Sequence, residues 1–330
     1  MKAFRMFGRG AGVGIAAVVL ALTASACSSS GGGGGGTSSA PNTAANPPAS
    51  TGGSSGLPGA GKPAITMGDK DFAEEFLLGQ LYSQALKAKG YTVNLKENIG
   101  SSEVIDKALT SGQIQIYPEY TGVIYTVLAN LGDQPKSKEV TYDGAKSFEN
   151  KRGYDILDPT PFQDADGVAV LNSYAQKNGL KTIDDLKKLS HFTYLGPPEN
   201  ATRFQGVVGL KQAYGLNNFT FKPLKTGSQY SAIDNGQADS IAIFTTDAQL
   251  ASGKYTVLTD TKGIFGFQQV VPVVKQSVLT AMGPEFADTL NAVSKLLTTD
   301  AIIAMNKAVQ IDQKSPADVA KAFLQANGLA

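Results

Sequence analysis

The feature that most constrains the fold is a stretch from residue 28 to residue 62 that is almost devoid of large apolar side chains. Its 35 residues comprise 11 Gly, 8 Ser, 5 Ala, 4 Pro, 3 Thr, 2 Asn, Leu57 and Lys62. Such a segment cannot repay the conformational entropy lost on ordering, so we expect a disordered, flexible tether. The globular part of the 330-residue chain is then confined to residues 63–330, a length that predicts about two lobes.

The charged residues divide at the same point, because all 28 Asp and Glu residues lie after residue 62. The globular part carries 25 Lys and Arg residues and thus a net charge of −3. A mildly acidic domain lacks the basic face that binds a phosphate backbone, so no nucleic-acid partner is expected. The single Cys and single His exclude an intrachain disulfide, a cysteine-rich zinc site and every motif that needs two histidines. We expect no metal and no cofactor.

The first 27 residues have the layout of a secretory signal. A basic start at residues 1–9 is followed by an apolar run at residues 11–22 and by small residues that end at Cys27. The apolar run is too short for a stable membrane span. Small residues before a lone cysteine, followed by a Gly/Ser tether, resemble the lipobox of bacterial lipoproteins, although Ala24 stands where such boxes usually carry Leu.

The resemblance to a lipobox implies that Cys27 becomes the lipid-modified first residue of the mature protein. It places the chain at the extracytoplasmic face of the cell membrane, held there by a lipid anchor. A 35-residue Gly/Ser tether has a typical reach of about 30–35 Å, so the globular part stays within reach of a membrane partner. The alternative is an ordinary signal peptide in which the cysteine has no role.

Residues 63–330 alternate between strand-like and helix-like segments, which predicts an α/β fold with largely parallel sheets. Strands are expected at residues 65–67, 91–95, 114–116 and 192–195, and helices at 71–89, 101–110, 284–297, 301–309 and 315–324. A helix, a stopping glycine, a Gln and an apolar strand occur in this order at Gly112 and again at Gly236. This repetition suggests two lobes of like construction, with a ligand cleft at the carboxyl ends of their strands.

Residues that could support catalysis are weakly placed. The Gly-x-Ser-x-Gly pattern at residues 52–56 lies in the tether, without the strand and helix that a nucleophile elbow requires. His191 stands between a helix and a strand and is expected at the surface, and the adjacent Glu74 and Glu75 diverge on a helix. We therefore expect no enzymatic activity.

The run Tyr117-Pro-Glu-Tyr120-Thr-Gly122 follows the strand expected at residues 114–116, so it is predicted at a carboxyl end where clefts form. Two tyrosines, a carboxylate and the Thr121 hydroxyl offer π faces and polar contacts that suit a small cation or zwitterion. The alternative is that both rings pack in the core while Glu119 begins a helix.

Several motifs together resemble the substrate-binding lipoproteins of ABC importers for glycine betaine, choline and carnitine. They are KDFAEE at 70–75, GSSEV at 100–104, GQIQIYPEYTG at 112–122, LDP at 157–159, RFQGVVGL at 203–210 and Thr246-Asp247. The resemblance covers residues 65–330 in order, and YPEYTG is its most specific part. It implies a two-lobed periplasmic-binding-protein fold (type II) with a ligand cleft between the lobes, working as a monomer with an ABC permease.

In that family the chain passes from the first lobe to the second and back. The resemblance places the first lobe at residues 63–162 and 269–330 and the second at 163–268, with crossings near residues 160–166 and 266–272, each close to a proline. Ligand closure of the two lobes is the expected mechanism.

The ligand site carries over in part. Tyr120 matches a tyrosine of the quaternary-ammonium cage, whereas Asp166, Phe244 and Gln268 stand where members carry further cage tyrosines. The expected ligand-binding residues are Lys70, Glu75, Tyr117, Tyr120, Thr121, Asp166, Arg203, Phe244 and Gln268. Among them Lys70 and Arg203 match cationic positions that can meet a carboxylate.

The resemblance implies an extracytoplasmic solute-binding protein that delivers a small quaternary amine or zwitterion to an importer. The carboxylate of Asp166 favours a solute with a net positive charge, such as choline. The alternative keeps the fold and the transport role but assigns a different polar solute, because the aromatic cage is largely replaced. An enzyme on the same fold and a surface protein with a vestigial cleft are the other hypotheses.

Overall fold

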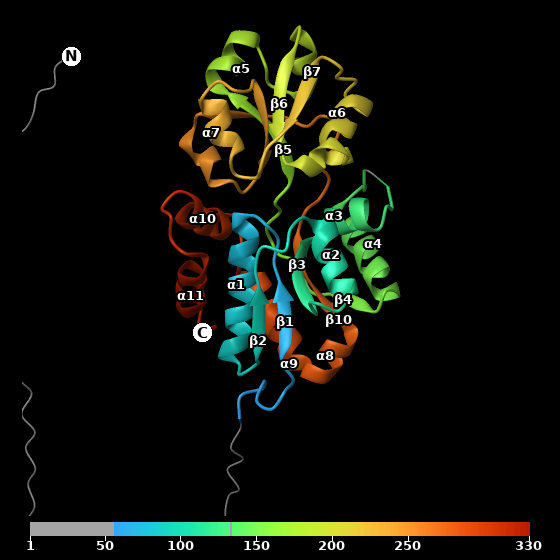
Figure 1. Cartoon of the computed structure of the whole chain (residues 1–330), viewed down its shortest axis with the longest axis vertical. Coiled ribbons are helices and arrows are strands. Elements are labelled where there is room, and N and C mark those ends of the chain that lie inside the picture. Colours follow the sequence, from blue (N-terminus) through green and yellow to red (C-terminus); the bar gives the residue numbers. More distant parts are fainter. Residues whose placement is uncertain (1–55, 133) are drawn as a thin grey trace, which may run out of the picture. The chain divides into compact units, whose positions relative to one another are not determined.

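The computed structural model describes residues 56–132 and 134–330 (Figure 1). The expected signal sequence, Cys27 and the tether up to residue 55 lie outside these residues. In the described part of the chain, no helix is long and apolar enough to cross a membrane.

The described strands form two five-stranded sheets, one in each of two lobes (Figure 1). The first sheet has the order β2-β1-β3-β10-β4, and the second has the order β7-β6-β8-β5-β9. In chain order the strands are β1 (Ile65–Gly68), β2 (Val93–Lys96), β3 (Ile116–Tyr120), β4 (Tyr154–Ile156), β5 (Asp166–Leu171), β6 (Phe192–Gly196), β7 (Phe219–Pro223), β8 (Ser240–Phe244), β9 (Tyr255–Leu258) and β10 (Val270–Lys275). The two-lobed α/β architecture expected from the sequence is confirmed.

The sheets are mixed rather than largely parallel, which corrects the sequence-based expectation. Strands β2, β1 and β3 run parallel, as do β7, β6 and β8. The strands that follow the two passages between lobes, β5 and β10, each run antiparallel to both of their neighbours. A strand that enters a sheet from the cleft side begins at the edge where the parallel strands end, so it must run the opposite way.

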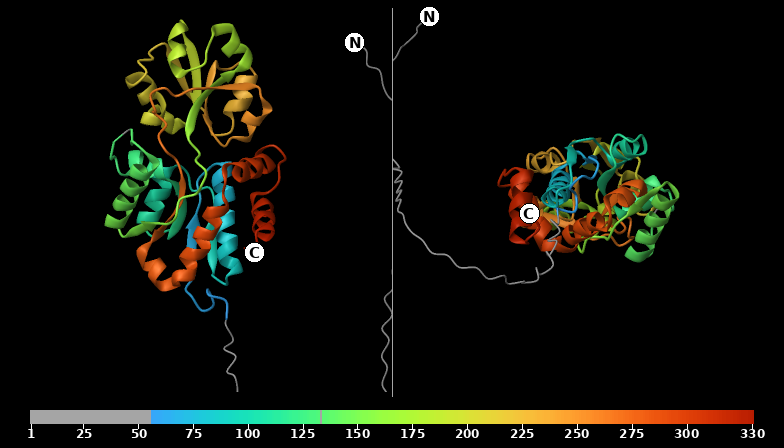
Figure 2. Two further views of the ribbon diagram at one scale, coloured as in Figure 1. Left: turned by 180° about the vertical axis from the view of Figure 1, so that it is seen from behind. Right: turned by 90° about the horizontal axis from the view of Figure 1, so that it is seen from below.

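Helices cover both faces of each sheet (Figures 1 and 2). In the first lobe, α1 packs against α9, α10 and α11, which close one face, while α4 packs against β4 and α3. The helices are α1 (Ala73–Ala88), α2 (Ser102–Thr110), α3 (Thr121–Val123), α4 (Lys138–Lys151), α5 (Asn172–Asn178), α6 (Gly209–Gln212), α7 (Gln229–Asp234), α8 (Gln276–Met282), α9 (Pro284–Leu296), α10 (Thr299–Gln310) and α11 (Pro316–Ala326). Shorter or irregular helical turns are η1 (Ile124–Leu128), η2 (Ile183–Lys188), η3 (Pro198–Ala201), η4 (Phe204–Val208) and η5 (Ala248–Ser252).

Local signals explain several of these boundaries. Gly112 and Gly236 follow the helices of the two repeated helix-to-strand units, and they adopt φ values of 80° and 71° that strongly favour glycine. Before η2, Thr182 and Asp185 form a capping box, which pairs backbone amides that the first turn of a helix leaves free. The three terminal helices occur at the expected places, each with an apolar face in the core of the first lobe.

Residues 56–62, assigned to the tether from their composition, form a turn against the first lobe. The amide of Gly59 donates to the carbonyl of Lys89 at 2.9 Å, and Lys62 Nζ donates to the carbonyl of Ala281 at 3.0 Å. Carbonyls at helix C-termini need such partners because no later helical amide reaches them. The ordered structure therefore begins before residue 63.

The Tyr-Pro-Glu-Tyr run lies within β3 rather than after it, because the strand starts at Ile116 and not at Ile114. Its central Pro118 pairs with Pro272 of the antiparallel neighbour β10. A proline lacks the amide that a regular ladder uses. The amide of Thr121 donates to the carbonyl of Gln269, and hydrogen-bonded and non-hydrogen-bonded pairs alternate along an antiparallel ladder, so Pro118 and Pro272 face each other where the ladder between β3 and β10 uses no amide. Only Tyr120 remains at the carboxyl end of the strand.

The two segments that connect the lobes run side by side (Figure 2). They pair through an antiparallel bridge between Gln163 and Gln269, and the amide of Asp164 donates to the carbonyl of Gln268 at 3.0 Å. Gly122 lies against this pair: a Cβ there would stand 2.5 Å from the carbonyl oxygen of Phe267. The glycine thus allows the end of β3 to approach the connection closely.

We expect Gly122→Ala to lower the free energy of unfolding by about 1–3 kcal/mol, because the added methyl overpacks against a backbone carbonyl. Urea unfolding measures this. The matched control is Gly56→Ala, whose added Cβ meets nothing nearer than 3.7 Å and which should change the same quantity by less than about 0.5 kcal/mol. Equal stabilities of the two variants would contradict the close-approach argument.

Candidate functional site

A pocket with about 40 Å³ of free space lies between the lobes, at the carboxyl ends of β1, β3 and β8. The first lobe and the second lobe both contribute to its wall. The lining residues are Lys70, Asp71, Phe72, Ser101, Ser102, Tyr120, Val123, Asp164, Asp166, Glu199, Asn200, Arg203, Thr226, Phe244 and Gln268. Six of the sequence-predicted ligand residues are in this set: Lys70, Tyr120, Asp166, Arg203, Phe244 and Gln268.

Three of the lining side chains are aromatic and stack in a row. The ring of Phe72 lies between that of Tyr120, at a centroid distance of 6.3 Å, and that of Phe244, at 5.6 Å. The planes are tilted by only 19° and 12°. Because Tyr120 ends β3 of the first lobe and Phe244 ends β8 of the second, the row crosses the boundary between the lobes.

Phe72 is the functional candidate that reasoning from the sequence missed. Helical periodicity assigns it to the core face of the first helix together with Phe76, Leu77 and Leu81. In the structure the helix begins one residue later, at Ala73, and Phe72 keeps an extended backbone (φ −140°, ψ 162°) that turns its ring toward the pocket. The available signal is its position close to the carboxyl end of β1, since Tyr120 and Phe244 stand at the carboxyl ends of β3 and β8.

Lys70 is buried beneath the ring row, with 2% of its side chain exposed. Its Nζ lies 4.3 Å from the centroid of the Tyr120 ring, within the range of a cation–π contact. It pairs with Glu119 and, at 3.3 Å, with Glu75, both of which are fully buried. Burial opposes the charge of Lys70, but these carboxylates raise its pKa above the ordinary value, so the ammonium stays charged.

Glu75 does not line the pocket and contacts Lys70 from below. Burial raises the pKa of Glu75 to about 8 against the opposing charge of Lys70, so at neutral pH this carboxyl is mostly protonated. The ammonium that sequence reasoning offers to a ligand carboxylate is thus already matched by a protein carboxylate.

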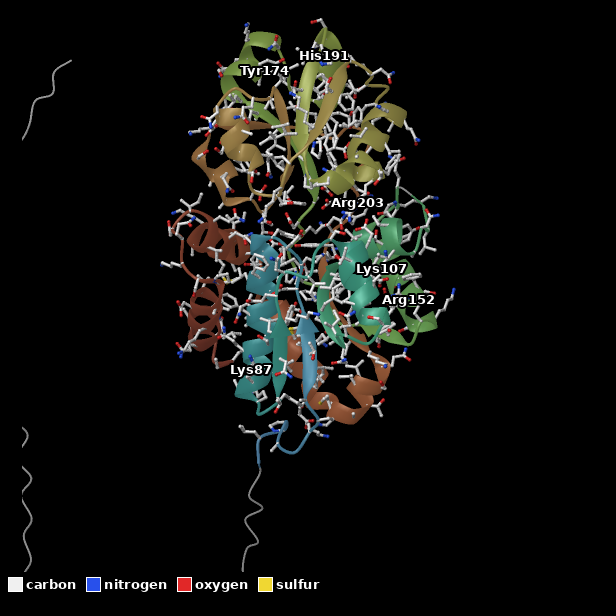
Figure 3. All side chains as sticks on the ribbon, in the orientation of Figure 1. Lys87, Lys107, Arg152, Tyr174, His191 and Arg203 are labelled. Carbon is white, nitrogen blue, oxygen red and sulfur yellow. The ribbon has the colours of Figure 1, made fainter. Side chains whose placement is uncertain are left out.

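Arg203 lies at the boundary between the lobes, whereas His191 stands at the opposite end of the second lobe (Figure 3). The guanidinium forms two hydrogen bonds with Glu103 of α2, at 3.3 Å from Nε and 2.8 Å from Nη2. Although partial burial acts against it, the charge of Arg203 lowers the pKa of Glu103 below its ordinary value. This ion pair joins the two lobes on one side of the pocket.

The remaining charged lining residues are acidic: Asp71, Asp164, Asp166 and Glu199. Burial raises the pKa of Asp166 to about 6, with Arg203 opposing the shift. At pH 7.5 the group is therefore mostly ionised. Lys70 and Arg203 are both ion-paired to carboxylates outside the lining, so Asp166 faces the pocket beside cations that are already paired.

The other expected ligand residues are placed differently. Tyr117 is fully buried and belongs to the apolar cluster with Ile105 and Ile124, so it is a core residue in this structure. Thr121 is also buried, and its hydroxyl accepts from the amide of Gln269 at 3.2 Å, which ties β3 to the second connection. Gln268 lines the pocket while its Oε1 accepts from the amide of Val123 at 3.2 Å. No measurement on ligand contacts tests these roles, and the assignment of ligand residues stays a prediction.

Comparison with known proteins supplies the family. Residues 63–326 match the family model described as the substrate binding domain of ABC-type glycine betaine transport system. A glycine-betaine-binding protein of Pseudomonas aeruginosa is 30% identical over 278 residues, covering 80% of this chain and 88% of that protein. An ergothioneine transport permease/ergothioneine binding protein of Helicobacter pylori is 26% identical over 268 residues, covering 80% of this chain and 48% of that protein.

The fold is likewise that of solved structures. A crystal structure titled glycine betaine/carnitine/choline ABC transporter superposes with a TM-score of 0.65 at 23% identity, covering 80% of this chain and 99% of that chain. Residues 63–326, which match the family model, span both lobes and include every residue of the pocket described above. Because the family model accounts for nearly the whole described chain, the protein belongs to the substrate-binding domains of ABC-type glycine betaine transport systems.

Proposed function

We propose that the chain captures a small quaternary ammonium solute, such as choline or glycine betaine, between its lobes and delivers it to an ABC permease. The observation that carries the proposal is the row of Phe72, Tyr120 and Phe244 beside the carboxylate of Asp166. Aromatic faces attract a quaternary ammonium through the ring quadrupole, and a nearby carboxylate adds charge attraction in a partly desolvated site.

A solute with a net positive charge, such as choline, is favoured over a zwitterion. The lining cations Lys70 and Arg203 already pair with Glu119 and Glu103. A ligand carboxylate would have to displace one of these protein carboxylates or lie in a negative field. The stacking of Phe72 also supplies a ring where sequence reasoning counts too few, which weakens the case for an unrelated polar solute.

The proposed mechanism is closure of the lobes around the solute. We assign residues 63–162 and 269–330 to one moving body and 163–268 to the other, with the paired connections as the hinge. A solute that contacts Tyr120 on one lobe and Phe244 on the other makes all its contacts only when the lobes are closed, so binding shifts the population toward closure. The ion pair of Arg203 with Glu103 supports the same state from the rim.

We further propose that the protein works as a monomer at the extracytoplasmic face of the membrane, held by a lipid on Cys27. No bond of the solute is made or broken in this role, so no catalytic residue is assigned. The composition of residues 28–55 predicts a flexible tether with about 30 Å of reach toward the permease.

We expect Phe244→Leu to weaken choline binding about 2- to 30-fold, because it removes one cation–π contact worth about 0.5–2 kcal/mol while keeping apolar volume. Isothermal titration calorimetry measures the dissociation constant. Phe219→Leu is the matched control, since Phe219 stacks on Phe192 in the same lobe and does not line the pocket. Equal affinity of the two variants would remove Phe244 from the site.

Choline affinity is expected to fall as the pH is lowered from 7.5 to 5, because Asp166, with its pKa near 6, loses its charge on protonation. Asp166→Asn should bind roughly tenfold or more weakly at pH 7.5 and show a flatter pH profile. The folded-state pKa lies above the ordinary value of 3.8, so protonation of this group stabilises the fold as the pH falls through 6. Weaker binding at low pH therefore cannot arise from unfolding driven by Asp166, and an unchanged profile in the variant would refute the role of this carboxylate.

Metabolic labelling with radioactive palmitate tests the anchor. The unaltered chain should carry the label and sediment with membranes, whereas Cys27→Ser should do neither, because serine has no thiol to acylate. Ser30→Ala, three residues along the tether, should behave like the unaltered chain. A labelled Cys27→Ser variant would show that the lipid is attached elsewhere.

A further inference from the structure

A second and larger cavity of about 210 Å³ lies beside the ring-lined pocket and shares Phe72 and Phe244 with it. Its wall comes from the start of α1, the first connection, the residues after β8, η5 and α10, so it also lies between the lobes. Figure 1 shows α10 at the edge of the first lobe that faces the second. Three carboxylates line the cavity: Glu74, Asp164 and Asp247.

Glu74 joins the two lobes at the floor of this cavity. It accepts hydrogen bonds from the hydroxyl of Tyr120 at 2.8 Å, from the hydroxyl of Thr246 at 2.6 Å and from the amide nitrogen of Asn306 at 2.7 Å. Burial raises its pKa, and burial together with the charge of Glu74 raises the pKa of Asp164. Both shifts favour the protonated carboxyls, and a cation bound in the cavity would draw these groups back toward their charged form.

Asp247 adds a carboxylate that does not line the ring pocket. One of its oxygens accepts from the Tyr230 hydroxyl at 2.7 Å and from the Phe244 amide at 2.9 Å. Burial raises the pKa of Asp247 to about 6, so at pH 7.5 the group is mostly ionised. The second carboxylate oxygen remains available to a ligand.

Amide oxygens without donors complete the wall. Asn306 is 1% exposed, and its amide nitrogen donates hydrogen bonds to Glu74 and to the carbonyl of Thr246. Its Oδ1 has no hydrogen-bond partner among the described residues. The Oε1 atoms of Gln249 and Gln310 are likewise buried and unpartnered in that part of the chain. Buried acceptors that lack donors are costly, and a ligand that supplies N–H groups removes the cost.

The cavity thus presents acceptors and negative charge together. A quaternary ammonium has charge but no N–H, so it leaves the amide oxygens unsatisfied. Within the described residues no group of three or more His, Cys, Asp or Glu side chains has the spacing of a metal site. We propose that this cavity is a second cation subsite, which takes a protonated primary amine or a guanidinium group.

The subsite rests on the proposed closure around a solute, because both cavities need the two lobes together. The N–H-bearing cation has two sources: a second small molecule, or the far end of one solute whose quaternary ammonium lies in the ring pocket. The shared wall of Phe72 and Phe244 brings the two cavities within reach of one extended organic cation.

The test is calorimetry of the full chain at pH 7.5 and constant ionic strength with methylammonium and tetramethylammonium chloride as probes. Asp247→Asn keeps an oxygen for Tyr230 and Phe244 and removes the charge, so it should weaken methylammonium at least tenfold more than tetramethylammonium. Asp166→Asn, which alters the ring pocket, should shift the ratio of the two dissociation constants in the opposite direction. Gln249→Leu removes one unpartnered oxygen without touching the Asp247 hydrogen bonds and should weaken methylammonium about 3- to 10-fold.

A solute that carries both groups, (3-aminopropyl)trimethylammonium, separates the two sources. If one extended solute fills both cavities, it binds at least tenfold more tightly than either probe, with one molecule per chain. If the cavities act separately, two molecules bind per chain. Both results support the subsite.

Methylammonium binding that is absent, or that neither Asp247→Asn nor Gln249→Leu weakens, overturns the proposal. A different result would overturn only the proposed quaternary-amine site: tetramethylammonium does not bind, whereas methylammonium binds and is weakened by Asp247→Asn. The subsite would then still be supported. The two failures are therefore distinguishable.

Discussion

The pairing of Lys70 with Glu119 under the ring of Tyr120 is the interaction on which the pocket depends. A buried ammonium without a carboxylate is strongly destabilising, so this pair fixes the end of β1 against the end of β3. The same ammonium lies over the Tyr120 ring and orients it, and Tyr120 in turn orders Phe72. This buried ion pair therefore positions two of the three rings that line the pocket.

The consequence for selectivity is electrostatic. A cation that is neutralised inside the protein no longer attracts an anion, and the same holds for Arg203 once it binds Glu103. The charged lining residues other than these two paired cations are carboxyl groups, and they lie beside the aromatic row. In the proposed function, the ion pairs of Lys70 and Arg203 account for a preference for cations, and the pair of Arg203 with Glu103 also supports the proposed closed state.

Much of the fold could be predicted from local sequence, because its signals are local. The glycines at 112 and 236, the capping box at Thr182 and the three terminal helices each follow from the conformational preferences of a few residues. Strand direction could not be predicted, since β5 and β10 run antiparallel only because of where the chain re-enters each sheet. The sequence predicts a strand that ends at residue 116, before Pro118, for a related reason. A proline looks like the end of a strand until its partner on the neighbouring strand, here Pro272, is known.

The same distinction applies to the site. Tyr120, Phe244, Asp166 and Arg203 could be placed at the cleft because they belong to motifs at strand ends or connections, whereas Tyr117 was assigned to the ligand on the motif alone. Within a strand, residues three apart point to opposite faces, so Tyr117 and Tyr120 cannot both reach one pocket once the motif is known to be β3. The partners of Lys70 and Arg203 come from segments far apart in the sequence, and no spacing of residues predicts these ion pairs.

The place of β10 in the first sheet has a consequence for biosynthesis. This strand lies between β3 and β4, yet it follows β3 by about 150 residues, because the segment from α3 to β4 and the whole second lobe come between them in the chain. At ribosomal rates of roughly 5–20 residues per second, the edge of β3 waits on the order of ten seconds or more for its neighbour. Until then it is an unpaired strand of the kind that templates aggregation. The amino-terminal half of the chain is thus the half that finishes folding last, and a nascent chain needs protection until its carboxyl-terminal sixty residues have emerged.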